Sequence, residues 1–248
     1  MLANMPVARF IVSRVCSSLG DQVLMFAVPL IVYRYTNSVA MSGSAFFIEW
    51  LPRVILLPIA GTIADRLGGP RIYAVADAIR AAASLLAAAL VLAFPRDTFA
   101  LVTALIALSA VLYAQVMVAT EVTVARLVDT ANMAKAQSLL QVAEQSAYIG
   151  GPAVAAVAVV WLSPAALLWG VGGLFASSAF LAWTLRARLA AALADGRPRH
   201  KPHIAADLLL GVQIVRRTPV VLKLTAMGMV ANLLVGFAFA TSAALTIG

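Results

Sequence analysis

The chain contains little that an ordinary soluble enzyme depends on. Of its 248 residues only 11% are charged and 8% are aromatic, and Cys16 is the single cysteine. Soluble domains usually carry about a quarter charged residues, so this composition excludes an ordinary soluble domain. A lone cysteine excludes an internal disulfide and suggests no metal cluster. The sequence has no Gly-x4-Gly-Lys-Ser/Thr loop and no nucleophile–base constellation, so we expect no enzyme, no ATP-driven pump and no cofactor.

Long apolar runs take the place of these features. Hydrophobic residues make up 63% of the chain and its mean hydropathy is +0.98, as in integral membrane proteins. A helix needs about 20 apolar residues to cross a bilayer. Arg9 and Arg14 precede apolar residues as in a signal peptide, but the apolar run continues to Tyr33, contains Asp21 and has no cleavage site. The sequence therefore predicts an all-α integral membrane fold with seven spans, at residues 10–33, 40–60, 72–94, 98–120, 137–161, 164–185 and 219–242.

The formal net charge of +8 comes from basic residues on one side of the predicted membrane. Eleven lysines and arginines fall in alternate connections or at their edges, whereas only Arg34 and Arg96 fall in the opposite ones. This bias places the N-terminus, the connection around Arg66 and residues 186–218 in the cytoplasm. The last segment is a basic linker that includes a short amphipathic helix beside the lipid headgroups. No basic stripe with interleaved aromatics occurs, so nucleic acid is not an expected partner.

A short, charged, glycine-rich turn separates the second and third predicted spans. It resembles the loop between the second and third helices of the major facilitator superfamily, which reads roughly Gly-x-Leu-Ala-Asp-Arg-x-Gly-Arg-Arg. In that family the aspartate bonds to neighbouring cytoplasmic helix ends and helps to hold the outward-facing state. The alternative is a charged turn that serves topology only. The matching positions are Gly61, Ala64, Asp65, Arg66, Gly68 and Arg71.

Asp77 and Arg80 follow this turn inside the third span. We interpret them as an extension of its charge network by one to two helical turns. Their three-residue spacing also allows a local ion pair.

The fifth span contains a stripe of small residues, Ala147, Gly151 and Ala155, and Pro152 directly follows Gly151 in the sequence. Small side chains let another helix approach closely. The stretch also resembles the antiporter motif Gly-x3-Gly-Pro-x2-Gly-Gly, with alanine at three of its four glycines. A general packing seam has nearly the same pattern, so both interpretations stay open.

The resemblance implies a fold of two six-helix bundles, each made of 3+3 inverted repeats. Residues 1–185 correspond to the N-terminal bundle and residues 219–248 to the first helix of a second bundle. The segments around Asp21 and over 210–219 are similar to the bacterial macrolide and siderophore exporters. The implied function is proton-coupled export of a small molecule by alternating access, in the bacterial inner membrane. Two alternatives are a half-transporter that pairs with a second copy or a separate second half, and a membrane interaction protein that does not transport.

Four charged residues within the spans are predicted to carry coupling. Asp21 lies near the middle of the first span, where an ionised carboxylate is costly and its protonation would remove the charge. The alternative is a purely structural role, as one half of an ion pair or at a hydrogen-bonded kink beside Gly20. Glu49 and Arg53 are four apart, so they can neutralise each other on one helical face. Glu144 opens the fifth span, and the arginine that many proton-coupled relatives carry in the fourth span is missing between 98 and 120.

Overall fold

The structure, a computed structural model, describes residues 5–193, 217–220, 223, 227 and 230. The chain divides into two units, Met1–Arg199 and His200–Gly248. In the second unit the described positions from 219 to 230 are helical. The predicted linker and amphipathic helix at 186–218 and the predicted seventh span at 219–242 therefore lie largely outside the described residues.

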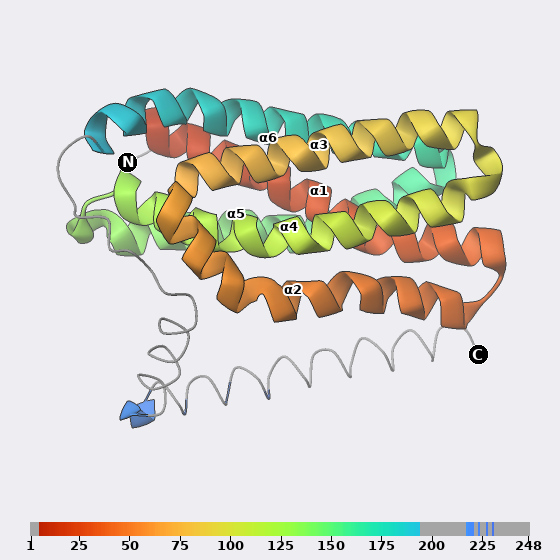
Figure 1. Cartoon of the computed structure of the whole chain (residues 1–248), viewed down its shortest axis with the longest axis horizontal. Helices are drawn as coiled ribbons and strands as arrows, with labels where there is room; N and C mark the ends of the chain where they lie inside the picture. Colours follow the sequence, from red (N-terminus) through yellow and green to blue (C-terminus); the bar gives the residue numbers. More distant parts are fainter. Residues whose placement is uncertain (1–4, 194–216, 221–222, 224–226, 228–229, 231–248) are drawn as a thin grey trace. The chain divides into compact units, whose positions relative to one another are not determined.

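The first unit is a set of six long α-helices of 25 to 32 residues (Figure 1). No strand occurs in the described part of the chain, which confirms the predicted all-α class. Two 3-10 turns, η1 (Pro95–Asp97) and η2 (Thr130–Asn132), precede the fourth and fifth helices. The helices are α1 (Met5–Thr36), α2 (Val39–Leu67), α3 (Gly69–Ala93), α4 (Thr98–Leu127), α5 (Met133–Trp161) and α6 (Pro164–Leu193).

Among the described residues, four helices are long and apolar enough to cross a membrane: α1, α3, α4 with η1, and α6. They coincide with the predicted spans at 10–33, 72–94, 98–120 and 164–185. The other two, α2 and α5, have 29 residues each. At 1.5 Å per residue such a helix is about 43 Å long, more than the roughly 30 Å of a bilayer core. Their length therefore also suffices.

The helices extend beyond the apolar runs that predict them. α2 continues to Leu67, and a single residue, Gly68, separates it from α3. Gly68 has φ +85°, a value that glycine adopts without steric cost, and its amide donates to the Ala64 carbonyl at 3.0 Å. The polar turn predicted over 61–71 is thus mostly helical, and α6 likewise continues to Leu193, past its predicted end at 185. Continued helix is favourable because it satisfies backbone groups that the turn would leave open.

The helices pack so that α1 and α3 have several neighbours each. α3 lies along α6 and α4, while α1 lies along α5, α6 and α2, and α2 lies along α4. Two glycines allow the closest approaches to α1. A Cβ at Gly20 would come within 2.9 Å of the Phe175 ring of α6, and one at Gly151 of α5 would collide with Gln22.

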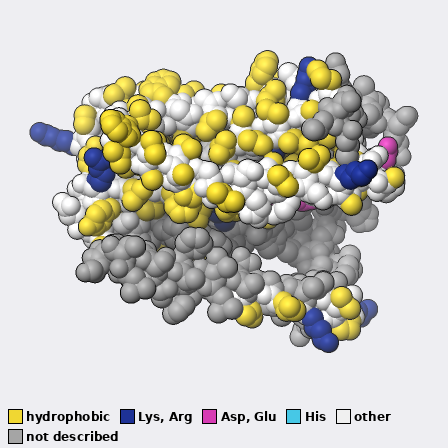
Figure 2. Space-filling model, turned by 180° about the vertical axis from the view of Figure 1, so that it is seen from behind, with side chains coloured by type: hydrophobic (Ala, Val, Ile, Leu, Met, Phe, Trp, Pro, Cys, Tyr) yellow, Lys and Arg dark blue, Asp and Glu magenta, His cyan; other side chains and the backbone are white. Residues whose placement is uncertain are grey.

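The surface of this unit is apolar and its interior is partly polar, the reverse of a soluble protein. Apolar side chains cover much of the face in Figure 2, and dark blue Lys and Arg side chains lie mainly near the ends of the bundle. Trp161, Ile149 and Phe180 are exposed. Such a surface suits contact with lipid.

The interior contains two apolar clusters with a polar layer between them. Val28 and Leu168 belong to one cluster, and Phe10 and Val116 belong to the other. On α3, α4 and α6 the polar positions between the clusters are Asp77 and Arg80, Ser109, and Ser178. Between Phe10 and Val23, the buried residues of α1 are Ser13, Arg14, Ser17, Ser18, Gly20, Asp21 and Gln22.

Candidate functional site

The polar layer begins with the spacing of residues on α1. Ser13, Ser17 and Asp21 are four apart, so they lie on one face of the helix and are all buried. Buried polar groups need partners within the protein, because neither lipid nor apolar side chains can provide them. The neighbouring helices must therefore place polar or charged side chains opposite this face of α1.

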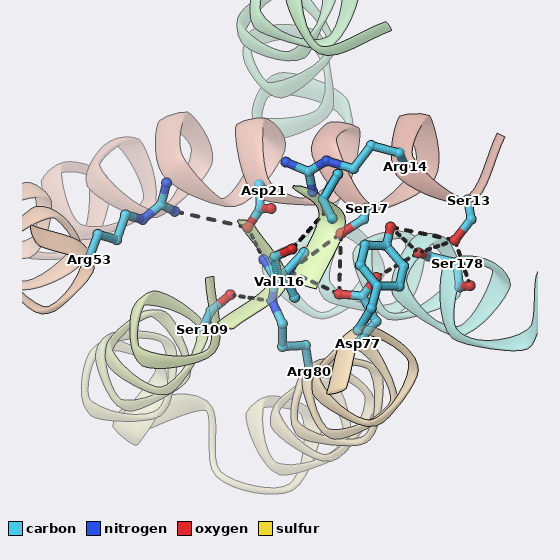
Figure 3. Close-up of polar contacts among 12 residues, drawn as sticks. Ser13, Arg14, Ser17, Asp21, Arg53, Asp77, Arg80, Ser109, Val116 and Ser178 are labelled. Carbon is cyan, nitrogen blue, oxygen red and sulfur yellow. Dashed lines mark hydrogen bonds and ion pairs between the residues drawn. The ribbon is translucent and has the colours of Figure 1, made fainter. Parts of the chain in front are cut away.

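Asp21 connects α1 to two other helices. Its carboxylate forms an ion pair with Arg80 of α3, and Arg53 of α2 places Nη2 4.0 Å from Oδ1 (Figure 3). The side chain of Asp21 is 1% exposed, as is that of Arg80. A single buried carboxylate is thus shared by two guanidinium groups from two different helices.

Arg80 has polar and aromatic contacts on every side. Its Nη1 lies 3.1 Å from Oδ1 of Asp77, one helical turn away, and its Nε donates to Ser109 of α4 at 3.1 Å. The guanidinium also lies over the Phe175 ring of α6, 4.0 Å from its centroid. These contacts allow a charged group to stay in an apolar interior.

Asp77 receives two hydroxyl donors besides Arg80. Ser17 of α1 donates to Oδ1 at 3.2 Å, and Ser178 of α6 donates to Oδ2 at 2.6 Å (Figure 3). The Ser178 hydroxyl also lies 3.1 Å from the Tyr73 hydroxyl and 3.0 Å from that of Ser13. A ladder of hydroxyls therefore joins α1, α3 and α6 beside the charges.

Arg53 continues the charges into α2. It forms an ion pair and hydrogen bond with Glu49, one turn earlier on the same helix. Its guanidinium lies over the ring of Tyr113 of α4, 3.9 Å from the centroid. The five groups alternate in sign along one line: Glu49, Arg53, Asp21, Arg80 and Asp77. We call these five residues the charge line.

Glu144 belongs to a separate pair. Its Oε1 accepts a hydrogen bond from Nε of Arg14 of α1 at 2.8 Å, which ties α1 to α5. The Glu144 side chain is 28% exposed, whereas Arg14 is buried. Among the described residues, no group of three or more histidine, cysteine or carboxylate side chains could hold a metal ion.

The residues of the predicted turn lie where α2 meets α3. Gly61 is half-buried and Arg71 is exposed, and a Cβ at Gly68 would be 3.5 Å from the Arg126 guanidinium. Asp65 and Arg66 are in the last turn of α2. Asp77 and Arg80 are predicted to extend the charge network of this turn. In the structure Arg80 forms ion pairs with Asp77 and with Asp21 of α1.

The small-residue stripe of α5 lies inside the bundle. Ala147, Gly151 and Ala155 are all buried, and Pro152 is half-buried. Because α5 packs along α1 and Gly151 is close to Gln22, the stripe contributes to the contact that holds the polar face of α1 in place.

Several residues of the site were not singled out from the sequence. In the sequence Arg14 has the pattern of an N-terminal flanking charge, and the serines of α1, α4 and α6 do not stand out from their apolar surroundings. The four-residue spacing of Ser13, Ser17 and Asp21 is a signal that would have revealed the α1 face. No comparable local pattern marks Ser109 or Ser178, because each contributes one hydroxyl from a different helix.

A comparison with protein families matches residues 10–247 to the Major Facilitator Superfamily. Neither the comparison with curated proteins nor the comparison with solved structures gives a match.

Proposed function

Because this chain belongs to the major facilitator superfamily, whose members are secondary transporters, we propose that it exports a small molecule in exchange for protons. It is a multi-pass membrane protein. We expect alternating access, with substrate bound between this bundle and a second one. The second bundle is a further part of the same protein, a second copy or a separately encoded second half.

The observation that carries the proposal is Asp21, a buried carboxylate shared by guanidinium groups of α2 and α3. An ionised side chain at the centre of a membrane helix costs about 2.5–3.5 kcal/mol on insertion scales. Such groups mark ion and substrate pathways or helix contacts that change. A change in the protonation of the charge line alters the attraction between α1, α2 and α3, and these contacts would break or form in an alternating-access cycle.

The direction and the class of substrate rest on the resemblance described above. The Gly151-Pro152 stretch is similar to that of antiporters, and the region around Asp21 is similar to macrolide and siderophore exporters. We further propose a bacterial inner membrane location with the N-terminus and the basic linker in the cytoplasm. The turn from Gly61 to Arg71 would then lie on the cytoplasmic side, where it would act as the conformational switch.

The test is proton flux in proteoliposomes that contain the natively expressed protein and a pH-sensitive dye. We expect a macrolide or a hydroxamate siderophore to trigger proton movement in the wild type. Asp21→Asn should abolish the movement without changing the amount of protein, because the two guanidinium groups lose their shared anion. Asp129→Asn, a matched change at an exposed position, should retain it. Undiminished flux in Asp21→Asn would remove Asp21 from the mechanism.

A further inference from the structure

We propose that Glu49 of α2 is the group that binds the coupled proton, and that Asp21 is the permanent anion between the two arginines. This inference rests on the proposed proton-coupled function and assigns its protonation site. It stands on the charge balance of the buried groups and on the number of cations and hydroxyl donors beside each carboxylate.

The charge line has an odd number of charges. Glu49, Asp21 and Asp77 give three negative charges, and Arg53 and Arg80 give two positive ones, so the fully ionised line has a net charge of −1. The neighbouring pair of Arg14 and Glu144 is neutral and does not correct the balance. All five side chains are at most 10% exposed, so water cannot compensate the excess. A buried uncompensated charge is strongly unfavourable, and one bound proton removes it.

The surroundings of the three carboxylates show which one takes the proton. Asp77 accepts hydrogen bonds from two hydroxyls as well as from Arg80. Asp21 has a guanidinium group from each of two helices. Neither oxygen of Asp21 has a hydrogen bond, so its negative charge is balanced by the two guanidinium groups alone, whereas that of Asp77 is balanced by one guanidinium group and two hydroxyls.

Glu49 is the least compensated of the three. It lies at the end of the charge line and has one cation, Arg53, which it shares with Asp21. Its Oε1 accepts the hydrogen bond from Arg53, whereas its Oε2 is buried without any hydrogen-bond partner. Glu49 is 1% exposed. Among the side chains that the structure describes, the titratable or charged groups placed at this end are Arg53 from α2, Asp21 from α1 and Tyr113 from α4, and Arg53 is the only cation among them.

Protonation at Glu49 would change a contact between helices. Arg53 and Glu49 are on the same helix, so their pair does not hold α2 to another element. Asp21 is on α1, and its Oδ1 is already 4.0 Å from Arg53 Nη2. When Glu49 is neutral, Asp21 alone attracts Arg53, which strengthens the link between α1 and α2. When Glu49 loses the proton, Arg53 returns to it and the link weakens.

The experiment is infrared difference spectroscopy of the full protein in membranes between acidic and alkaline pH. The protein is made by cell-free synthesis with either glutamate or aspartate carrying carbon-13 in the side-chain carboxyl group. The chain has three glutamates, Glu49, Glu121 and Glu144, so the assignment is simple. We expect a carbonyl band of a protonated carboxylic acid that shifts with labelled glutamate only. It should disappear in Glu49→Gln and persist in Glu121→Gln and Glu144→Gln.

Three results would overturn the proposal: a band that shifts with labelled aspartate only, a band that survives in Glu49→Gln, or no such band at any pH. Glu49→Asp, which keeps a carboxyl group at this position, provides a second check that covers a failure of Glu49→Gln to fold. In that variant the band should return and shift with labelled aspartate instead, and its absence would also count against Glu49. The band does not require transport. A glutamate band without proton flux would therefore contradict the proposed function while leaving the protonation site standing.

Discussion

At the scale of single residues, the polar layer is maintained by groups that each satisfy several others. Arg80 is the clearest case, since its guanidinium contacts two carboxylates, a serine hydroxyl and an aromatic face. Removing one partner of a buried ion pair is costly mainly because the remaining charges stay buried without compensation. The stability of the bundle and the state of the charge line are therefore coupled.

Arg80→Ala should lower the free energy of unfolding by about 3–5 kcal/mol, since it leaves both Asp21 and Asp77 without their shared cation. The measurement is unfolding of the purified protein by titration with a denaturing detergent, followed by circular dichroism. Arg96→Ala, an exposed arginine in η1, should change the value by less than about 0.5 kcal/mol. Equal effects of the two changes would show that Arg80 is not part of a stabilising network.

Ser178→Ala should destabilise the bundle by about 1–3 kcal/mol, because Oδ2 of Asp77 loses its 2.6 Å donor and stays buried. The neighbouring Ser177 offers a matched control. Its hydroxyl is exposed and bonds only to the Gly173 carbonyl of its own helix, so Ser177→Ala should be close to neutral. The same detergent titration compares the two variants. A smaller loss for Ser178→Ala than for Ser177→Ala would contradict the hydroxyl ladder.

At the scale of helices, glycine positions decide how closely α1 is approached. The absence of a side chain at Gly151 lets α5 pack against Gln22, and its absence at Gly20 leaves room for the Phe175 ring of α6. Both contacts are next to Asp21 in the sequence of α1. Small shifts of α5 or α6 would therefore also move the carboxylate relative to Arg53 and Arg80.

Gly151→Ala should destabilise the protein by about 1–3 kcal/mol, since the added methyl group would collide with Gln22 of α1. Gly150 is the matched control, because a Cβ there meets nothing within 4 Å. Gly150→Ala should be neutral or should stabilise α5 by up to about 1 kcal/mol through helix propensity. Thermal unfolding midpoints of the two variants give the comparison. If Gly151→Ala were as stable as Gly150→Ala, the close approach of α1 and α5 would be wrong.

At the scale of the whole molecule, the proposed transport requires the cavity between this bundle and a second one to open alternately to the two sides of the membrane. The junction of α2 and α3, a single residue at Gly68, joins the two helices that supply both arginines of the charge line. A junction this short would couple a movement of α2 to α3. We expect Asp65, at the end of α2, to influence which state is populated.

Asp65→Ala should shift the protein toward the inward-facing state. The measurement uses a Cys16→Ser background with single cysteines at two half-buried positions of α4, Leu101 near one end and Val122 near the other. Val122 lies at the same end as the α2–α3 junction, close to Gly69. A membrane-permeant thiol reagent should then label Val122→Cys several-fold faster and Leu101→Cys more slowly than without the Asp65 change. Unchanged labelling rates would count against a switch at this turn, and Asp97→Ala at the exposed η1 turn is the control.

Hydropathy along the chain is enough to predict an all-α membrane protein and the positions of four membrane-capable helices, because hydropathy over about 20 residues is a local property. The ion pairs Glu49–Arg53 and Asp77–Arg80 can also be predicted from the sequence, because the partners in each pair are one helical turn apart. The positions of the helix ends are harder to predict from the sequence. α2 and α6 continue past their apolar runs because backbone hydrogen bonding, not hydropathy, decides where a helix stops.

Helix packing, by contrast, is what makes Asp21 the common anion of Arg53 and Arg80 and places Ser109 and Ser178 beside this network. These partners are distant in sequence and come from different helices. Their meeting depends on which helix faces pack together and at what height along the bundle. Close approaches such as those at Gly20 and Gly151 set that register, and no local pattern of charges encodes it.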